Sequence, residues 1–349
     1  MNQQNNRIAY IDTARGIALL MVIFGHLKFP YITTWIYSCH IPLFFFLSGM
    51  VFKGEKKTFA QFVKKSAKSL LIPYFALGTV IWIFLSGIYL FDPQPPQFIA
   101  GAIDTPVNML LNFLIQRHYW TVWFLPCLFF SQIILWILLR ITSGRNGKTI
   151  FFSTVLCVFA FVYYRFGGDT LPWNLDTALV AQFFVCLGYE YAHADSCKGF
   201  REVIACSKIY AKKIFITALL AIGNIMFCIL NIKLANANLD MSVHLYGIEL
   251  FAILSAVFGI LFVLSAAAVL QTEQILAYLG RNTMLVFAWH SRIMIPAFNY
   301  LYLWLGLFQS ESMIQKCVYC IVTAAGVLAI LLPLNYIISK SKIKFIVGR

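Results

Sequence analysis

Residues 69–91 read SLLIPYFALGTVIWIFLSGIYLF and carry no charged side chain. A helix needs about 20 mostly apolar residues to cross a hydrocarbon core of about 30 Å, and this stretch is long enough. Residues 119–139 and 317–338 are uncharged as well. Membrane-spanning strands would alternate apolar and polar residues, and these runs do not. The sequence therefore predicts an all-α fold, a helical bundle that crosses a membrane several times.

The composition of the 349 residues agrees with this prediction. Hydrophobic residues make up 61% of the chain and charged residues 11%, whereas a soluble domain is roughly half apolar and about a quarter charged. The net charge of +14 is compatible with a nucleic-acid partner, but the basic residues lie between the apolar runs. We therefore expect contact with membrane lipid and no nucleic acid. No group of side chains has the spacing of metal ligands, so no metal site is predicted.

Ten spans are predicted, and the distribution of Lys and Arg orients them. The segments that would face the cytoplasm hold 21 of the 27 Lys and Arg residues if the amino terminus is cytoplasmic. The positive-inside rule then places both termini in the cytoplasm. No separate soluble domain is visible, so residues 1–349 are predicted to form a single domain. The predicted spans are 14–30, 33–52, 69–91, 119–139, 149–165, 177–192, 214–232, 245–270, 283–307 and 317–338.

The first predicted span carries titratable side chains that are expensive to place in a membrane. Arg15 and His26 are eleven residues apart, which corresponds to about 16 Å and about three helical turns. Both side chains therefore project to a similar side of the helix. Asp12 precedes Arg15 by three residues and can pair with it, although it is equally compatible with an N-cap. A structural interpretation, with Arg15 reaching lipid headgroups and His26 bonded to another helix, is open on these grounds.

These residues belong to a longer pattern. The stretch from Tyr10 to Ala18, followed by His26, resembles the opening of the acyltransferase family 3 integral membrane proteins, whose first helix has a basic residue, ten residues and then His. The second predicted span, with His40-Ile-Pro-Leu-Phe-Phe-Phe-Leu-Ser-Gly, is similar to that family's next motif. Further similarities are Lys65-Ser-Ala-Lys68 ahead of Pro73, Trp123-Phe-Leu, and Gly280-Arg281-Asn-Thr with His290. The short form without a soluble domain is similar to sugar O-acetyltransferases of the fucose 4-O-acetylase-like kind.

The resemblance implies a membrane-bound O-acyltransferase with acyl-CoA, typically acetyl-CoA, as its donor. Because CoA carries several phosphates, cations on the cytoplasmic side suit it. The residues expected to bind the donor are Arg15, Lys65, Lys68 and Arg281. Positive-inside charge alone also accounts for the two lysines, and Lys lacks the bidentate geometry of Arg. No cofactor is expected to be bound permanently, because acyl-CoA is a substrate.

The expected acceptor is a hydroxyl of a cell-envelope or lipid-linked glycan, and the expected location is a bacterial cytoplasmic membrane. The predicted catalytic residues are His26, Arg15 and Asp12. His26 is the candidate general base, because imidazole titrates near neutrality, and Asp12 would orient Arg15. The residues expected to bind the acceptor are His40, Trp123, His290 and Arg292. Structural roles in the bundle remain open for the imidazoles and for Arg292. A glycan transporter or flippase without chemistry is the alternative function, since it would also place charges inside spans.

Overall fold

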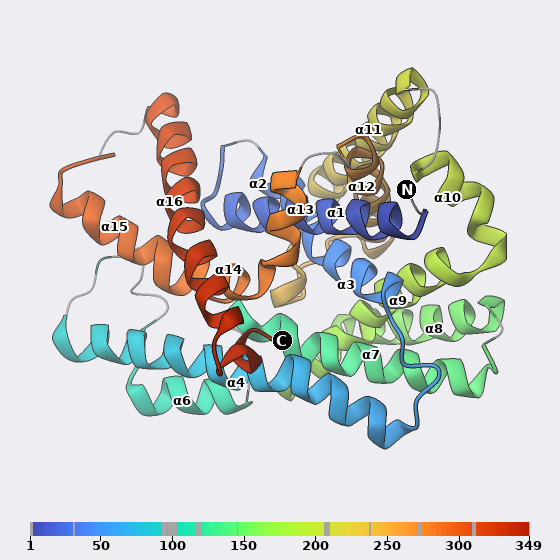
Figure 1. Ribbon diagram of the computed structural model, residues 1–349, viewed down its shortest axis with the longest axis horizontal. Helices are drawn as coiled ribbons and strands as arrows, with labels where there is room; N and C mark the ends of the chain where they lie inside the picture. Colours follow the sequence, from blue (N-terminus) through green and yellow to red (C-terminus); the bar gives the residue numbers. More distant parts are fainter. Residues whose placement is uncertain are drawn as a thin grey trace.

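The computed structural model describes the residues listed at the end of this paragraph. Their secondary structure is helical, apart from an isolated antiparallel bridge between Asp240 and Leu245. Figure 1 shows the helices packed around α3, with α1 and α13 on one side of it and α9 on the other. The described residues are 3–30, 32–92, 96, 103–115, 121–144, 146–205, 210–236, 239–270, 274–308 and 312–348.

The helices fall into long and short elements. The long helices are α1 (Gln3–His26), α4 (Phe59–Phe91), α7 (Phe124–Ile141), α8 (Asn146–Arg165), α9 (Leu175–His193), α11 (Tyr210–Ala235), α12 (Glu249–Val269) and α16 (Met313–Lys340). The shorter α-helices are α2 (Thr33–Tyr37), α3 (His40–Met50), α6 (Pro106–Ile115), α10 (Lys198–Ala205), α13 (Gln274–Arg281), α14 (Thr283–Trp289) and α15 (Ile295–Trp304). A π-helix, η5 (His290–Met294), joins α14 to α15, and short 3₁₀ turns include η1 (Thr121–Trp123) and η4 (Met241–Val243).

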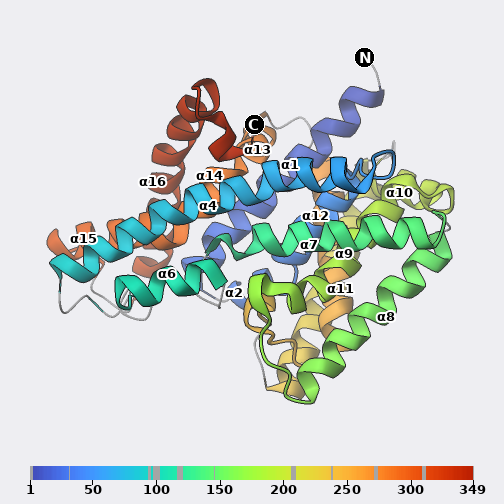
Figure 2. The same cartoon turned by 90° about the horizontal axis from the view of Figure 1, so that it is seen from below.

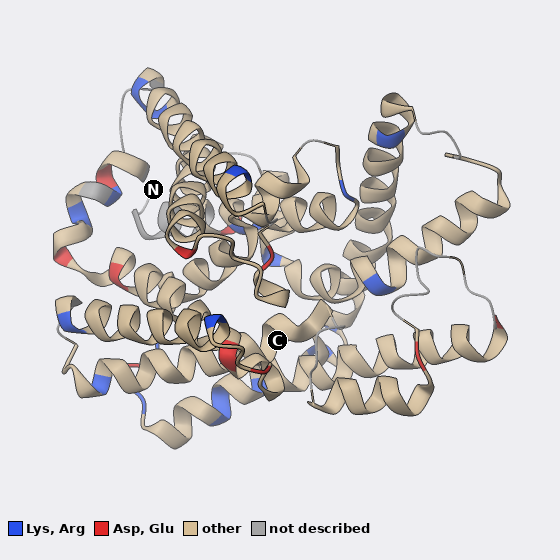
Figure 3. Ribbon diagram, turned by 180° about the vertical axis from the view of Figure 1, so that it is seen from behind, with Lys and Arg blue, Asp and Glu red and all other residues tan. Residues whose placement is uncertain are grey.

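The chain is a multi-pass membrane protein. Six helices within the described ranges are long and apolar enough to cross a membrane, namely α4, α7 extended by η1, α8, α11, α12 and α16. Large apolar side chains on several of them are exposed, for example Phe159, Phe215 and Ile330, as expected for surfaces that face lipid. Figure 2 shows α4 and α7 running side by side, and Figure 3 shows long uncharged stretches, with Lys and Arg concentrated near helix ends.

Two of the ten predicted spans are interrupted in the structure. The predicted span 33–52 is divided into α2 and α3 at Ser38 and Cys39, where the Ser38 hydroxyl donates to the Trp35 carbonyl and Cys39 leaves the helical conformation. The predicted span 283–307 is divided into α14, η5 and α15. Pro296 has no N–H to donate to the carbonyl of Arg292, four residues earlier, so one hydrogen bond of a regular α-helix is missing at this point. Helices α6, α10 and α13 lie outside all ten predicted spans.

Glycines allow two pairs of helices to approach closely. A Cβ atom at Gly188 of α9 would overlap the Phe46 carbonyl of α3, and one at Gly49 of α3 would overlap the Val185 carbonyl of α9. The same reciprocal relation links Gly16 of α1 with α13. Small residues drive helix association in lipid because they let backbones approach. These contacts hold α3 against α9 and α13 against α1.

Replacing Gly188 by Ala is expected to destabilise the protein, because the added methyl group forces α3 and α9 apart. Overpacking of this kind costs about 1–3 kcal/mol of unfolding free energy. The matched control is Gly87→Ala on α4, where nothing lies within 4 Å of the added Cβ. Thermal unfolding in detergent should show a lower Tm for Gly188→Ala and an unchanged or raised Tm for Gly87→Ala. Equal Tm values would contradict the close approach of the two helices.

Candidate functional site

Four element ends meet around a group of three imidazoles. Helix α1 ends at His26, α2 ends at Tyr37, α3 begins at His40, and the π-helix η5 begins at His290. The two interruptions in the predicted spans therefore occur where the imidazoles lie. Single-turn π-helical segments are rare and occur frequently at functional sites. The irregular backbone thus has a local purpose, which is to present side chains that a continuous helix would orient differently.

The distances between rings define the geometry of this group, which we call the imidazole cluster (His26, His40, His290 and Tyr37). The ring centroids of His26 and His290 are 4.9 Å apart, in an edge-to-face arrangement. The Tyr37 ring lies 6.3 Å from His26 and 5.0 Å from His40. The cluster therefore forms a continuous series of rings in the order His290, His26, Tyr37, His40.

Backbone carbonyls orient two of the imidazoles. The Nδ1 atom of His40 lies 2.8 Å from the Ile36 carbonyl oxygen, and the Nδ1 atom of His290 lies 2.9 Å from those of Val286 and Phe287. A carbonyl oxygen only accepts, so each Nδ1 carries the proton and each neutral ring keeps Nε2 as an acceptor. The Nε2 of His290 is buried and makes no hydrogen bond within the described part of the chain.

His26 differs from the other two imidazoles because it is exposed. His40 and His290 are buried, whereas the His26 side chain is accessible at the end of α1. It is the imidazole of this cluster that an external molecule could reach directly. An accessible imidazole is suited to accept a proton from a bound hydroxyl.

Arg15 and Asp12 lie in the amino-terminal half of α1, whereas His26 is its last residue. Arg15 Nη1 is 3.7 Å from Asp12 Oδ1, and Arg281 Nη1 is 3.6 Å from Asp12 Oδ2. Asp12 is buried, Arg15 is partly exposed and the Arg281 side chain is 52% exposed. The structure thus brings together three of the residues singled out from the sequence. One buried carboxylate holds two cations that keep accessible surface for an anionic ligand.

Close helix packing makes this ion-pair group possible. A Cβ atom at Gly280 would overlap the Asp12 carbonyl, because α13 lies directly against α1. The residue after this glycine is Arg281, which therefore reaches the Asp12 carboxylate. The motif near residue 280 and the motif near residue 15 form one unit in the fold.

Lys65 and Lys68 lie exposed on the first turns of α4 and make no ion pair within the described residues. Lys57, in the loop before α4, lies close to Lys65. A hydrogen bond with the Lys65 amine, slight desolvation and repulsion from that ammonium group lower the pKa of Lys57, and Glu55 opposes this shift. Two cations held so close together favour binding of an anion.

Trp123 and Arg292 differ in how close they lie to the imidazole cluster. Trp123 ends η1, which packs on α14 through the hydrogen bond from Thr121 Oγ1 to the Ala288 carbonyl, 3.2 Å long. The Trp123 ring contacts Phe124 and, among the described rings, none of the three imidazoles. Arg292 lies in η5, within electrostatic range of His26. The structure therefore places Arg292, but not Trp123, beside the imidazole cluster.

Sequence reasoning did not single out Tyr37, although its ring lies between His26 and His40. Its position three residues before His40 was a usable signal, since such neighbours share a helical face. The pairing of Arg281 with Asp12 was also unforeseen, because the two are far apart in the chain.

Comparison with known proteins adds three findings. A family model described as an acyltransferase domain matches residues 8–332. The chain is similar to the nodulation protein NolL of Mesorhizobium japonicum, with 27% identity over 209 residues, which cover 54% of this chain and 48% of that protein. The match thus spans about half the length of this curated relative. No solved structure matches the chain.

Proposed function

Because the chain belongs to the acyltransferase family whose domain model matches residues 8–332, we propose that it is a membrane-bound O-acyltransferase acting on glycans. The donor would be cytoplasmic acyl-CoA, with acetyl-CoA as the first candidate. The acceptor would be a hydroxyl of a cell-envelope or lipid-linked glycan. The family match supports the acyltransferase class, and the geometry of the two groups on α1 supports the division into a donor side and an acceptor side.

The proposed orientation has ten spans, one domain over residues 1–349 and both termini in the cytoplasm of a bacterium. The distribution of Lys and Arg supports this orientation. Under it, Asp12, Arg15 and Arg281 lie near the inner surface, where acyl-CoA is made. His26 and the imidazole cluster lie towards the outer half of the membrane. One continuous helix, α1, joins the two regions.

On the donor side, Arg15, Arg281, Lys65 and Lys68 bind the phosphates of CoA. Asp12 orients Arg15 and Arg281 and compensates their charge when no donor is bound. Guanidinium groups make bidentate hydrogen bonds with phosphate, and the lysines contribute charge without that geometry. The closeness of the Lys57 and Lys65 amines supports an anion at the start of α4.

On the acceptor side, His26 acts as the general base. The acceptor hydroxyl oxygen attacks the thioester carbonyl carbon while its proton passes to the His26 imidazole. The carbon–sulfur bond then breaks, the CoA thiolate takes up a proton, and the products are an O-acyl ester and CoA. His290 supports the His26 ring, and His40 and Arg292 bind the acceptor from their positions around it. Trp123, in η1, contacts the acceptor further from His26.

The single observation that carries this proposal is the contact between the exposed imidazole of His26 and the buried imidazole of His290. The two come from opposite ends of the family-matched region. A continuous helix then places Arg15 about 16 Å from His26, a distance that an extended pantetheine arm is suited to bridge.

The test is transfer of label from radiolabelled acetyl-CoA to a membrane glycan extract by the purified protein. Labelled glycan that yields acetate on mild base treatment is the expected product, because oxygen esters are base-labile. CoA should also raise the Tm of the protein, since a ligand that binds only the folded state stabilises it. Absence of transfer together with absence of CoA protection would reject the proposal in favour of glycan transport without chemistry.

A further inference from the structure

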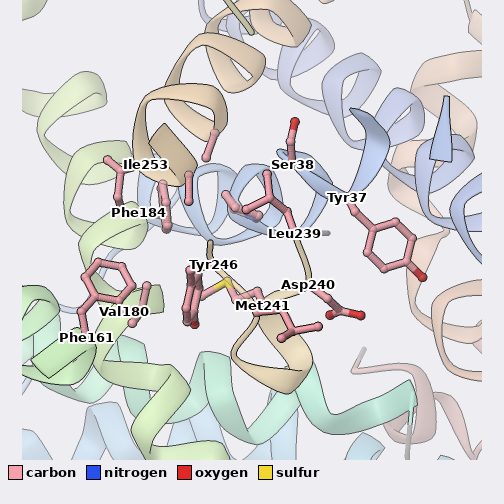
Figure 4. Close-up of a pocket in the computed structure, with 14 residues that line it drawn as sticks. Tyr37, Ser38, Phe161, Val180, Phe184, Leu239, Asp240, Met241, Tyr246 and Ile253 are labelled. Carbon is pink, nitrogen blue, oxygen red and sulfur yellow. The ribbon is translucent and has the colours of Figure 1, made fainter. Parts of the chain in front are cut away.

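A pocket beside the imidazole cluster has no role in the function described so far. It has a cavity volume of about 30 Å³ and is bounded by the junction of α2 and α3, by α8, α9 and α12, and by the segment 239–246. Figure 4 shows its labelled lining residues: Phe161, Val180 and Tyr246 lie at one side, and Tyr37 and Asp240 at the other. The side with Tyr37 is the side that adjoins the imidazoles, because the Tyr37 ring contacts both His26 and His40.

Tyr37 lies between the pocket and the imidazole cluster. Its hydroxyl makes no hydrogen bond with any residue that the structure describes, whereas its ring is held by two imidazoles. Asp240 lies close enough to act on Tyr37 electrostatically, and Figure 4 shows its carboxylate near the Tyr37 ring. A phenol and a carboxylate therefore face the same small region next to the exposed His26.

Asp240 is held rigidly in this position. Its Oδ1 atom accepts hydrogen bonds from the Ser242 N–H, 2.9 Å, and the Ser242 hydroxyl, 2.6 Å. Its backbone forms both hydrogen bonds of the bridge with Leu245, at 2.8 and 2.9 Å. In the described ranges, Oδ2 accepts no hydrogen bond, so this oxygen is available to a ligand.

The segment that carries Asp240 is in turn fixed to α9. The Nε2 atom of His244 lies 2.7 Å from the Thr177 hydroxyl and 3.5 Å from Asp176 Oδ2, and the Tyr164 ring stacks on the imidazole at 4.1 Å. Asp176 also accepts a hydrogen bond from the Leu171 N–H, 3.0 Å long. This network holds a loop that would otherwise be free to move, so the carboxylate is preorganised.

We propose that Tyr37 and Asp240 form the subsite that binds the acceptor, a polyhydroxylated sugar, and that they determine which of its hydroxyls reaches His26. The inference rests on the proposed function and extends it to residues that the sequence did not indicate. Oδ2 of Asp240 accepts a charge-assisted hydrogen bond from one sugar hydroxyl. The Tyr37 hydroxyl donates to a neighbouring oxygen, and an adjacent hydroxyl then faces the His26 imidazole.

The experiment compares Asp240→Asn and Tyr37→Phe with the wild-type protein in acetyl transfer to the membrane glycan extract. Asn keeps the shape of Asp240 but loses its charge, and Phe keeps the Tyr37 ring between the imidazoles. Asp240→Asn is expected to raise the KM for the glycan about tenfold or more, because a hydrogen bond to a charged group is weakened. Tyr37→Phe is expected to raise it about two- to tenfold, because the lost hydrogen bond joins neutral groups. The KM for acetyl-CoA should stay at the wild-type value.

The matched control is Asp169→Asn, which removes an exposed carboxylate from the loop between α8 and α9, outside the pocket lining. Thermal unfolding checks that all three variants are folded. An unchanged KM for the glycan in both pocket variants, or an equal rise in the KM for acetyl-CoA, would overturn the subsite.

Failure of the proposed function is distinguishable from failure of the subsite. If the wild-type protein transfers no acetyl group, the proposed function fails on that result alone. Binding of the membrane glycan extract to protein in nanodiscs then decides the subsite. Binding that Asp240→Asn weakens and Asp169→Asn does not would support it, and equal binding by the wild type and both variants would reject it.

Discussion

Replacing His26 by Ala is expected to lower kcat for acetyl transfer by about 10²- to 10⁴-fold, the usual contribution of a general base. His26 is the exposed imidazole of the cluster, whereas its neighbour His290 is buried. The measurement is the initial rate at saturating acetyl-CoA and glycan. The KM for acetyl-CoA should change little, because the donor phosphates are proposed to bind at Arg15, in the amino-terminal half of α1.

The control for this substitution is His193→Ala. His193 is also exposed, but its ring stacks on Tyr189 at the end of α9, and its Nδ1 bonds the Tyr189 carbonyl. The His193→Ala variant should retain the wild-type rate of acetyl transfer. A wild-type kcat in the His26 variant would show that His26 is not the general base, and His40 or His290 would then be tested in its place.

Replacing Arg15 by Gln is expected to raise the KM for acetyl-CoA by about 10- to 100-fold. A hydrogen bond to a charged group contributes about 1.5–3 kcal/mol, and each 1.4 kcal/mol corresponds to a factor of ten. The KM of Arg15→Lys should lie between those of the wild type and Arg15→Gln, because lysine keeps the charge and loses the bidentate geometry. Arg281→Gln should have a smaller effect, because the Arg281 side chain is 52% exposed and its interaction is screened by solvent.

Arg165→Gln is the matched control, since Arg165 is an exposed arginine at the end of α8, away from Asp12. Initial rates over a range of acetyl-CoA concentrations separate KM from kcat for each variant. A loss of kcat in Arg15→Gln at an unchanged KM would assign Arg15 to the chemical step instead of to donor binding.

Parts of this site followed from local spacing. The pairing of Asp12 with Arg15 was a prediction from three-residue spacing, and the structure places them 3.7 Å apart. The distance from Arg15 to His26 depends only on an unbroken helix, and α1 is unbroken from Gln3 to His26. Such relations are predictable because helical geometry repeats every few residues. The catalytic roles themselves are still predictions.

Other parts could not be predicted. The sequence indicated ten continuous spans, whereas the structure interrupts two of them at the residues around His40 and His290. Apolar composition is equally compatible with a continuous helix and with two helices joined by an irregular turn. The missing N–H of Pro296 did not make the interruption readable, because α4 and α16 continue through Pro73 and Pro333; the π-helical form of η5 depends on packing against neighbouring helices.

The sequence by itself determined that the chain lies in a membrane and that its fold is helical, because long uncharged runs are stable only as helices in a membrane. It also determined the relations within one helix, such as that of Arg15 to Asp12. Only the tertiary structure decided that His290 meets His26, that Arg281 meets Asp12, and that Asp240 lies beside Tyr37. In a membrane protein, faces toward lipid and faces toward other helices are both apolar, so hydrophobicity does not select the partners. Close contacts at Gly16, Gly49, Gly188 and Gly280 select them instead, and such contacts exist only once the helices have packed.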